Sequence, residues 1–148
     1  MVGFDAHGGV IRFDYNGRDD LTRVTDPRGL VTQYPRNGLG DATALVSPDT
    51  GTAAHTYDAA GNLLTRQDSR GVLASYSHDA MNRLIGVVHS HPTLGNQSFV
   101  WTYDQVGAGF SHGVGRLTST QYPGGSETFA YDAEGRVYVA RTEEEARA

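Results

Sequence analysis

Residues 55–71 read HTYDAAGNLLTRQDSRG, in which a Tyr-Asp pair is followed, three residues after the Asp, by Gly. Asp58 and Gly61 occupy the first and fourth corners that these residue types favour in a type I turn. The Asp58 carboxylate can accept the backbone N–H two residues on, and Gly adopts the left-handed conformation of a G1-bulge hairpin at little cost. We therefore predict a β-hairpin with its corner at Asp58.

The same pattern recurs along the chain with a period a little above twenty. The residues before the Asp position are Phe13, Tyr34, Tyr57, His78, Tyr103 and Tyr131. Four positions beyond them stand Gly17, Gly38, Gly61, Asn82, Gly107 and Gly135. Asn82 fits the turn because Asn tolerates positive φ better than most other residues. Such a period indicates a repeat architecture.

A second class of turn is predicted between these corners. Its members are Asp26-Pro27-Arg28-Gly29, Ser47-Pro48-Asp49-Thr50-Gly51, Asp68-Ser69-Arg70-Gly71 and Tyr122-Pro123-Gly124-Gly125. Two turns per period leave room for two strands of about five to seven residues each. Alternation within the strands places Val72, Ala74 and Tyr76 on one face. We predict an all-β fold of consecutive antiparallel β-hairpins in a twisted or spiralling sheet.

The repeats set the expected organisation of the chain. Residues 1–12 are an N-terminal lead-in with a partial repeat, residues 13–141 hold about six hairpin repeats, and residues 142–148 form a charged tail of helix-favouring composition. Three departures stand out: Asp19 and Asp20 are two additional residues in the first turn, Pro35 replaces an Asp, and residues 108–115 separate Gly107 from Arg116.

Composition excludes several classes of function. The chain has 148 residues, a net charge of −5 and no Cys. Nucleic-acid binding is not expected, because it requires concentrated positive charge. The lack of Cys excludes disulfides and thiolate zinc sites. Aliphatic stretches are too short for a membrane span, and the first residues lack the basic and apolar regions of a cleavable secretory signal.

The recurrent Tyr-Asp-x-x-Gly-Arg/Asn-Leu pattern over residues 13–137 resembles the YD repeats of the RHS (rearrangement-hotspot) family. The segments HTYDAAGNLLTRQDSRG, SYSHDAMNRLIGVV, GVGRLTSTQYPGG and FAYDAEGRV carry the resemblance. The residues matching its structural repeat motif are Tyr57, Asp58, Gly61, Asn62, Leu63, His78, Asp79, Asn82, Arg83, Leu84, Tyr103, Asp104, Gly107, Tyr131, Asp132, Gly135 and Arg136.

The resemblance implies hairpins that spiral into a hollow shell, as in bacterial polymorphic toxins, insecticidal toxin complexes and cell-surface proteins, where the shell encloses a toxic segment. We accordingly expect a non-catalytic structural segment of a shell that encloses or presents a toxin or surface domain. Its expected partners are neighbouring YD repeats or the enclosed polypeptide. The implied location is secreted or cell-surface, reached without an N-terminal signal peptide and preceded by a cytoplasmic stage.

Two other functions compete with this interpretation. A carbohydrate-binding or adhesion module would use the aromatic residues Phe99, Trp101 and Tyr103, which share one strand face. A self-cleaving aspartyl-type segment is suggested by the family, because residues 26–30 match half of a paired DPxG motif. Acid–base chemistry of this kind needs two carboxylates, and the other half of the motif is absent.

Metal sites and enzymatic motifs are not expected. His89 and His91 would share one strand face, but nothing in the sequence brings His112 or another third ligand to them. Calcium binding by the repeated Asp residues is disfavoured, because turn closure already uses their carboxylates. The chain contains none of the common nucleophile, phosphate-loop or zinc-protease motifs. We therefore predict no catalytic residue, no metal and no cofactor.

Overall fold

A computed structural model of the protein describes residues 1–4, 6 and 8–144. All regular secondary structure in these residues is β-strand, which confirms the predicted all-β fold of successive antiparallel hairpins. The strands are β1 (Val2–Phe4), β2 (Val10–Tyr15), β3 (Leu21–Thr25), β4 (Val31–Gln33), β5 (Ala44–Ser47), β6 (Gly51–Tyr57), β7 (Leu63–Gln67), β8 (Leu73–His78), β9 (Leu84–His91), β10 (Gly95–Tyr103), β11 (Leu117–Tyr122), β12 (Gly125–Tyr131) and β13 (Val137–Glu144).

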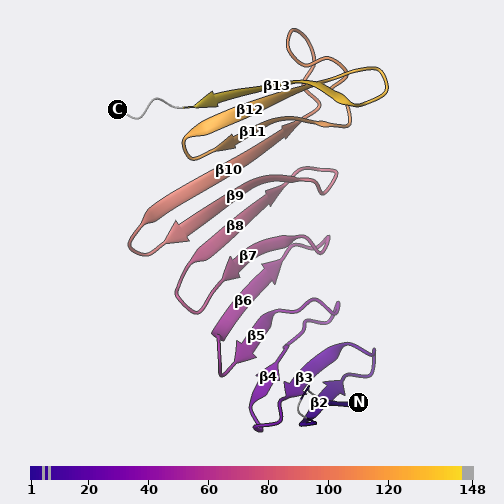
Figure 1. Ribbon diagram of the computed structural model, residues 1–148, viewed down its shortest axis with the longest axis vertical. Helices are drawn as coiled ribbons and strands as arrows, with labels where there is room; N and C mark the ends of the chain where they lie inside the picture. The colour runs from indigo at the N-terminus through magenta and orange to yellow at the C-terminus, as the bar shows by residue number, and fades with distance from the viewer. Residues whose placement is uncertain (5, 7, 145–148) are drawn as a thin grey trace. The chain divides into compact units, whose positions relative to one another are not determined.

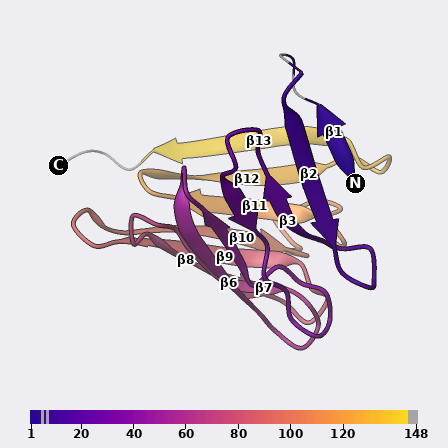
Figure 2. The same cartoon turned by 90° about the horizontal axis from the view of Figure 1, so that it is seen from below.

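The chain divides into two compact units, residues 1–73 and 74–148, and the division falls after the first residue of β8. Within each unit, strands that follow one another in the sequence are neighbours in the sheet. In the first unit, β2 pairs with both β1 and β3, and Figure 2 shows these three strands side by side. In the second unit, β9 to β13 form an uninterrupted antiparallel meander (Figure 1).

The ends of the chain differ from the expected boundaries at one point. β13 continues to Glu144 and pairs along its whole length with β12, from Tyr131↔Val137 to Gly125↔Glu144. The prediction of a helix-favouring tail is therefore wrong for residues 142–144, and residues 145–148 lie outside the described residues. Pairing with β12 gives the backbone of this segment its hydrogen bonds, and this outweighs a weak local helix propensity.

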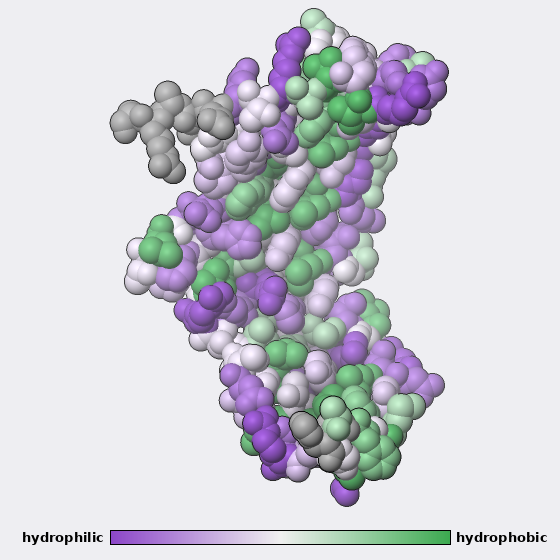
Figure 3. All heavy atoms as spheres, in the orientation of Figure 1, coloured by the Kyte–Doolittle hydropathy of each residue, from purple (hydrophilic) through white to green (hydrophobic). Residues whose placement is uncertain are grey.

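Each sheet is a thin layer with few buried side chains. Among the described residues, the buried hydrophobic side chains are Ala74, Val87, Ala130 and Tyr131, and the buried polar one is Thr118. All five belong to the second unit, and most other side chains are half-buried or exposed. In the view of Figure 3, hydrophobic side chains gather over the strands around β8 to β10 with no further layer covering them. No described helix is long and apolar enough to cross a membrane.

Candidate functional site

The corner at Asp58 is a closed five-residue loop. The Asp58 N–H donates to the Asn62 carbonyl oxygen at 2.9 Å, and the Gly61 N–H donates to the Asp58 carbonyl oxygen at 3.1 Å. The Asp58 carboxylate accepts the N–H groups of Ala60 and Asn62, both at 2.9 Å. Gly61 has a φ of 85° and the strand register shifts at Tyr57, as a G1 bulge requires. We call this loop an Asx corner and number its residues one to five.

Asx corners close hairpins at both ends of the strands. The described part of the chain has seven with the same main-chain bonds, opening at Asn16, Asp26, Asn37, Asp58, Asp68, Asp79 and Asp132. The prediction of a separate turn class at Asp26 and Asp68 is therefore wrong. The turns at Ser47–Gly51 and Tyr122–Gly125 are tighter, because their first and last residues pair directly across the hairpin.

The first two repeats are displaced by two residues from the predicted register. Their corners open with Asn, because an amide oxygen accepts the same N–H groups as a carboxylate. The two additional residues expected in the first turn are thus ordinary members of its corner. The residues before these corners are Tyr15 and Arg36 rather than Phe13 and Tyr34, and position four is held by Asp19 and Gly40 rather than Gly17 and Gly38.

The fifth repeat contains an insert and keeps only one main-chain bond of the Asx corner, the one from the N–H of position one to the carbonyl oxygen of position five. Asp104 donates its N–H to the Arg116 carbonyl oxygen at 3.1 Å, and its carboxylate accepts the Gly115 N–H at 2.5 Å. Gly115, with a φ of 77°, thereby takes the place predicted for Gly107. Gly107 instead lies within the insert, where its carbonyl oxygen accepts the Phe110 N–H at 3.1 Å.

The insert is fastened to the strands beside it. The hydroxyl of the fully buried Thr118 lies 2.9 Å from both the Thr102 carbonyl oxygen and the Gln105 amide oxygen. The Tyr131 N–H donates to the Ser111 carbonyl oxygen at 3.0 Å. Thr118 was not predictable from the sequence, because nothing in its local pattern distinguishes it from the other strand threonines.

At four corners, the side chain of the residue before the corner ties its hairpin to the preceding one. Tyr57, Tyr103 and Tyr131 donate their hydroxyls to the carbonyl oxygens of Ala42, Leu84 and Leu117, at 2.9, 3.2 and 2.5 Å. Arg36 makes the equivalent bond to the Leu21 carbonyl oxygen at 3.1 Å. Each acceptor is the residue directly after the preceding corner. The tyrosine of the motif therefore joins successive hairpins through its hydroxyl, a role its strand position alone did not indicate.

Position five of the corner makes a second link, which we call the Arg clasp. Arg83 donates from Nε to Oδ2 of its own corner residue Asp79 at 2.6 Å and from Nη2 to Oδ2 of Asp104 at 2.5 Å. Its guanidinium carbon also lies 4.3 Å from the centre of the Tyr103 ring, within the range of a cation–π contact. Arg116 similarly lies 5.4 Å from the centre of the Tyr131 ring. Arg83 was predicted as a motif residue, but its contact with the next hairpin was not.

The Arg clasp shifts the pKa values of the three residues that it joins. The Arg83 hydrogen bond is the main cause that lowers the pKa of the Asp104 carboxyl, and the backbone N–H of Arg83 is the main cause that lowers the pKa of Asp79. The two carboxylates in turn raise the pKa of Arg83. Because both carboxylates are ionised and paired, neither is suited to proton transfer near neutral pH.

The side chains at positions one and five also pair with each other in the five corners that open at Asn16, Asn37, Asp58, Asp79 and Asp132. Asn62 donates its amide to Asp58 at 2.9 Å, whereas the order is reversed in Asn37, which donates to Asp41 at 2.9 Å. Arg136 bonds Asp132 at 2.8 Å. Each of these corners thus joins one carboxylate to an amide or guanidinium, an arrangement that avoids repulsion between two adjacent carboxylates.

Substitutions at position four test the Asx corner. Gly61→Ala is expected to lower the free energy of unfolding by about 1–2 kcal/mol, because Ala resists positive φ. Gly61→Asn should cost clearly less, since Asn82 adopts a φ of 62° at the same position. Urea denaturation followed by circular dichroism measures both. Gly38→Ala is the matched control, because Gly38 lacks a positive φ and an added Cβ there meets no atom within 4 Å; equal costs for Gly38→Ala and Gly61→Ala would contradict the proposed geometry.

The paired carboxylates predict sensitivity to acid. The pKa values of Asp68, Asp79, Asp104 and Asp132 are lowered from the ordinary value of 3.8. The unfolded chain therefore binds more protons than the folded chain at low pH, and the stabilisation present above that ordinary value is lost as the pH falls below it. We expect a nearly constant melting temperature from about pH 7 to 5 and a steep fall below about pH 4. Asp104→Asn should make that fall shallower, and an unchanged acid transition in this variant would contradict the assignment.

The histidines considered as metal ligands have other surroundings. His91 Nδ1 accepts the Thr93 and Leu94 N–H groups at 3.1 and 3.2 Å, as a corner carboxylate would. His89 packs edge-on against Phe99, with ring centres 6.0 Å apart. His112 lies in the insert with a φ of 50°. Within the described residues, no three His, Asp or Glu side chains lie close enough to hold a metal ion.

The residues of the other two functional hypotheses are also engaged in structural contacts. The Asp26 carboxylate bonds Arg28 Nε at 2.7 Å and accepts the Leu30 N–H at 2.9 Å. Phe99, Trp101 and Tyr103 all lie in β10, and Arg83 covers one side of the Tyr103 ring, where a sugar would stack. Arg28 also bonds the Asp49 carboxylate through Nη2 at 3.3 Å, so a guanidinium pairs with both carboxylates. The Tyr103 ring has one face occupied by Arg83.

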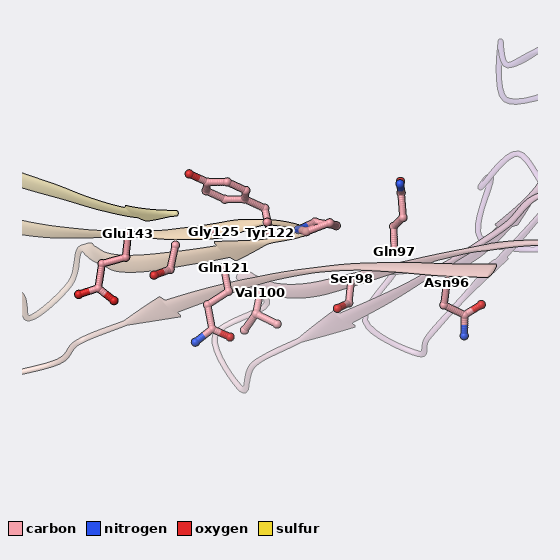
Figure 4. Close-up of a pocket in the computed structure, with 11 residues that line it drawn as sticks. Asn96, Gln97, Ser98, Val100, Gln121, Tyr122, Gly125 and Glu143 are labelled. Carbon is pink, nitrogen blue, oxygen red and sulfur yellow. The ribbon is translucent and has the colours of Figure 1, made fainter. Parts of the chain in front are cut away.

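A shallow polar hollow crosses β10, β11, β12 and β13. It includes Asn96, Ser98 and Val100, which alternate along β10 with the aromatic residues Phe99 and Trp101. Figure 4 shows Val100, Gln121 and Glu143 on one side of the strands, with Tyr122 and Gln97 on the other. The strand register explains this, because Val100 pairs with Gln121, and Ser126 pairs with both Gln121 and Glu143. Amides and hydroxyls line most of this surface, and it has no cluster of titratable groups suited to catalysis.

Comparison with known families identifies the corner motif. The RHS Repeat family matches residues 57–95 and 112–148, just over half of the chain. The chain belongs to the RHS repeat family. The matched segments include Asx corners at Asp58, Asp79 and Asp132, and the second segment begins within the insert at His112. No curated protein sequence matches the chain.

Solved structures share the fold of this RHS repeat chain. The crystal structure of TcdB2-TccC3 is 20% identical with a TM-score of 0.69, and TcdB2-TccC3 without its hypervariable C-terminal region is 20% identical with a TM-score of 0.68. A Photorhabdus luminescens Tc holotoxin pore is also 20% identical, with a TM-score of 0.69. Each match covers 88% of this chain and 7% of the other. The chain therefore spans a small fraction of the length of the chains it resembles.

Proposed function

We propose that this RHS repeat chain is a non-catalytic wall segment of a larger β-shell that encloses or presents a toxin or surface domain. The observation that carries the proposal is the use of the motif itself: its Tyr, Asp and Arg side chains bond neighbouring hairpins to one another. The repeat array over residues 13–141, extended by β13 to residue 144, is the structural unit of this wall.

The small number of buried side chains supports further repeats or an enclosed polypeptide as the partners of this segment. Few side chains are buried in either unit, so a large apolar area stays available to further repeats or to an enclosed polypeptide. The small fraction of the matched chains that is covered also agrees with a segment of a larger assembly. Because the corner carboxylates are held by backbone N–H groups and Arg side chains, they serve structure rather than proton transfer.

Electron cryo-microscopy of the protein as its source cell produces it tests the shell. We expect the hairpins to continue a sheet around a cavity, with the face bearing Trp101 covered by protein. An arrangement in which that face is open to solvent in the full assembly would overturn the proposal.

Intact mass spectrometry tests the absence of self-cleavage. After prolonged incubation at pH 4–7 the chain should keep its full mass, because the single Asp26 carboxylate is already paired with Arg28. Asp26→Asn should behave identically. Two fragments cut near Leu30, lost in Asp26→Asn, would show an autoprotease instead.

A further inference from the structure

Two of the Asx corners open with an Asn-Gly pair, Asn16-Gly17 and Asn37-Gly38, whereas the other described corners open with Asp. In an Asn-Gly pair the backbone nitrogen of the Gly can approach the side-chain carbonyl carbon of the Asn, because Gly has no side chain to obstruct it. A succinimide forms from this arrangement. The other Asn residues of the chain are followed by larger residues, and they are Asn62, Asn82 and Asn96.

The shape of the corner does not require Gly at its second position. Gly17 and Gly38 lack a positive φ, and a Cβ added at either one meets no atom within 4 Å. Both residues are exposed, and neither N–H donates a hydrogen bond to a described residue. The backbone nitrogen that would attack the Asn is therefore not held by another group. Three other corners carry Ala at this position, namely Ala59, Ala80 and Ala133.

The corner also orients the Asn side chain for attack. Oδ1 of Asn37 accepts the N–H groups of Leu39 and Asp41, both at 2.9 Å. Its Nδ2 donates to Oδ2 of Asp41 at 2.9 Å, which fixes the amide in this orientation. Asn16 makes the same three bonds in its own corner, at 2.9, 3.0 and 3.0 Å. When a nucleophile adds to Cγ, negative charge develops on Oδ1, and two donors already aimed at that atom stabilise it, as in an oxyanion hole.

We propose that Asn16 and Asn37 are modification sites, at which the folded corner converts its own Asn into Asp or isoaspartate. The Gly38 nitrogen bonds to Cγ of Asn37 and the Cγ–Nδ2 bond breaks. A succinimide forms, and Nδ2 leaves as ammonia, balanced by the proton that the Gly38 nitrogen gives up. Water then adds to one succinimide carbonyl carbon and breaks the bond from that carbon to the Gly38 nitrogen. Opening at Cγ yields Asp, and opening at the main-chain carbonyl carbon yields isoaspartate.

Each product weakens the corner for a different reason. An Asp in place of Asn37 still accepts the two N–H groups, but it loses the Nδ2 donor and sets a second carboxylate against Asp41, which is unfavourable because like charges repel. Isoaspartate routes the main chain through the former side chain, so an added methylene separates positions one and two and the corner can no longer make all its bonds. The pair of Asp58 and Asn62 avoids this repulsion, because it joins one carboxylate to one amide. Conversion thus loosens the first two repeats as the protein ages, whatever its function.

Peptide mapping of the folded protein tests the two sites. The protein is held at mildly alkaline pH, digested with trypsin at intervals and analysed by mass spectrometry, with the fresh sample as the baseline. Replacement of NH2 by OH identifies conversion, and methylation by an isoaspartyl methyltransferase identifies isoaspartate. We expect both signals at Asn16 and Asn37 and neither at Asn62, which lies in the same tryptic peptide as Asn37. Conversion that occurs in urea but not in the folded protein would overturn the proposal.

The second position provides matched variants. Gly38→Ala should slow conversion at Asn37 by at least about tenfold, because the added Cβ obstructs the approach of the nitrogen. It should leave conversion at Asn16 and the circular dichroism spectrum unchanged, and Gly17→Ala should have the converse effect. An unchanged rate at Asn37 in Gly38→Ala would contradict attack by this nitrogen.

Substitution by the product residue tests the consequence for the fold. Asn37→Asp should lower the urea midpoint of unfolding, followed by circular dichroism, because it sets two carboxylates side by side. Combining Asn37→Asp with Asp41→Asn recreates the pairing of Asp58 and Asn62 and should restore the midpoint. A midpoint unchanged by Asn37→Asp, or one that the second substitution fails to restore, would show that conversion to Asp does not weaken the corner by repulsion.

Discussion

Gly113→Ala is expected to unfold the insert and lower the free energy of unfolding by about 2–4 kcal/mol. A Cβ at Gly113 would lie 2.7 Å from Cγ2 of Thr118 and closer still to the Gln105 carbonyl oxygen. Thr118 is fully buried and the Gln105 carbonyl is backbone, so neither can move without opening the closure at Asp104. Urea denaturation and amide exchange of residues 104–118 measure the effect.

Two further variants keep this prediction specific. Gly86→Ala is the control in the same unit, because the nearest atoms to an added Cβ there lie at an ordinary contact distance of 3.7 Å. We expect Gly86→Ala to change the free energy of unfolding by less than about 0.5 kcal/mol. Thr118→Ser in the Gly113→Ala background removes the methyl contact but leaves the carbonyl contact, so stability should recover only in part. Full recovery would show that the backbone of Gln105 is not the obstacle.

Tyr131→Ala is expected to lower the free energy of unfolding by about 3–5 kcal/mol. The ring is 9% exposed and lies under Arg116, and its hydroxyl bonds the Leu117 carbonyl oxygen at 2.5 Å. Tyr131→Phe keeps the ring and removes only the tie between hairpins, so it should cost about 1 kcal/mol. Urea denaturation monitored by Trp101 fluorescence separates the two contributions.

The control is Tyr138→Ala, an exposed tyrosine whose hydroxyl meets Ser111 at the surface. It should cost less than about 1 kcal/mol. A Tyr131→Phe variant as stable as the parent would mean that the hydroxyl tie does not contribute to stability. A Tyr131→Phe variant as unstable as Tyr131→Ala would assign the whole effect to the hydroxyl.

The corners were the most predictable part of the molecule. Asp58, Gly61 and Asn82 reveal their geometry locally, because the bonds that close an Asx corner join residues at most four apart. The first two repeats were predicted two residues out of register, because Asn16 and Asn37 accept the corner N–H groups in place of Asp and the aromatic-Asp pattern does not mark them. Asp26 and Asp68 were assigned to another turn class because Pro27 and Ser69 obscured a shared pattern of bonds.

The links between hairpins were not predictable in the same way. The Tyr103 hydroxyl bonds a carbonyl 19 residues earlier, and Arg83 bonds a carboxylate 21 residues later. The place of Gly115 in the fifth corner was missed for the same reason, since the insert puts it 11 residues from Asp104. A recurrent Tyr rather than Phe before the corner, and an Arg four residues after the Asp, were the available signals.

The amino-acid sequence by itself determined the strand-and-corner pattern, the repeat period and the family, because each rests on hydrogen bonds and backbone angles within a few residues. Only the tertiary structure decided which side chains join one hairpin to the next and which glycine completes the interrupted corner. Those choices depend on the spacing of neighbouring strands, which brings residues about one repeat apart into contact.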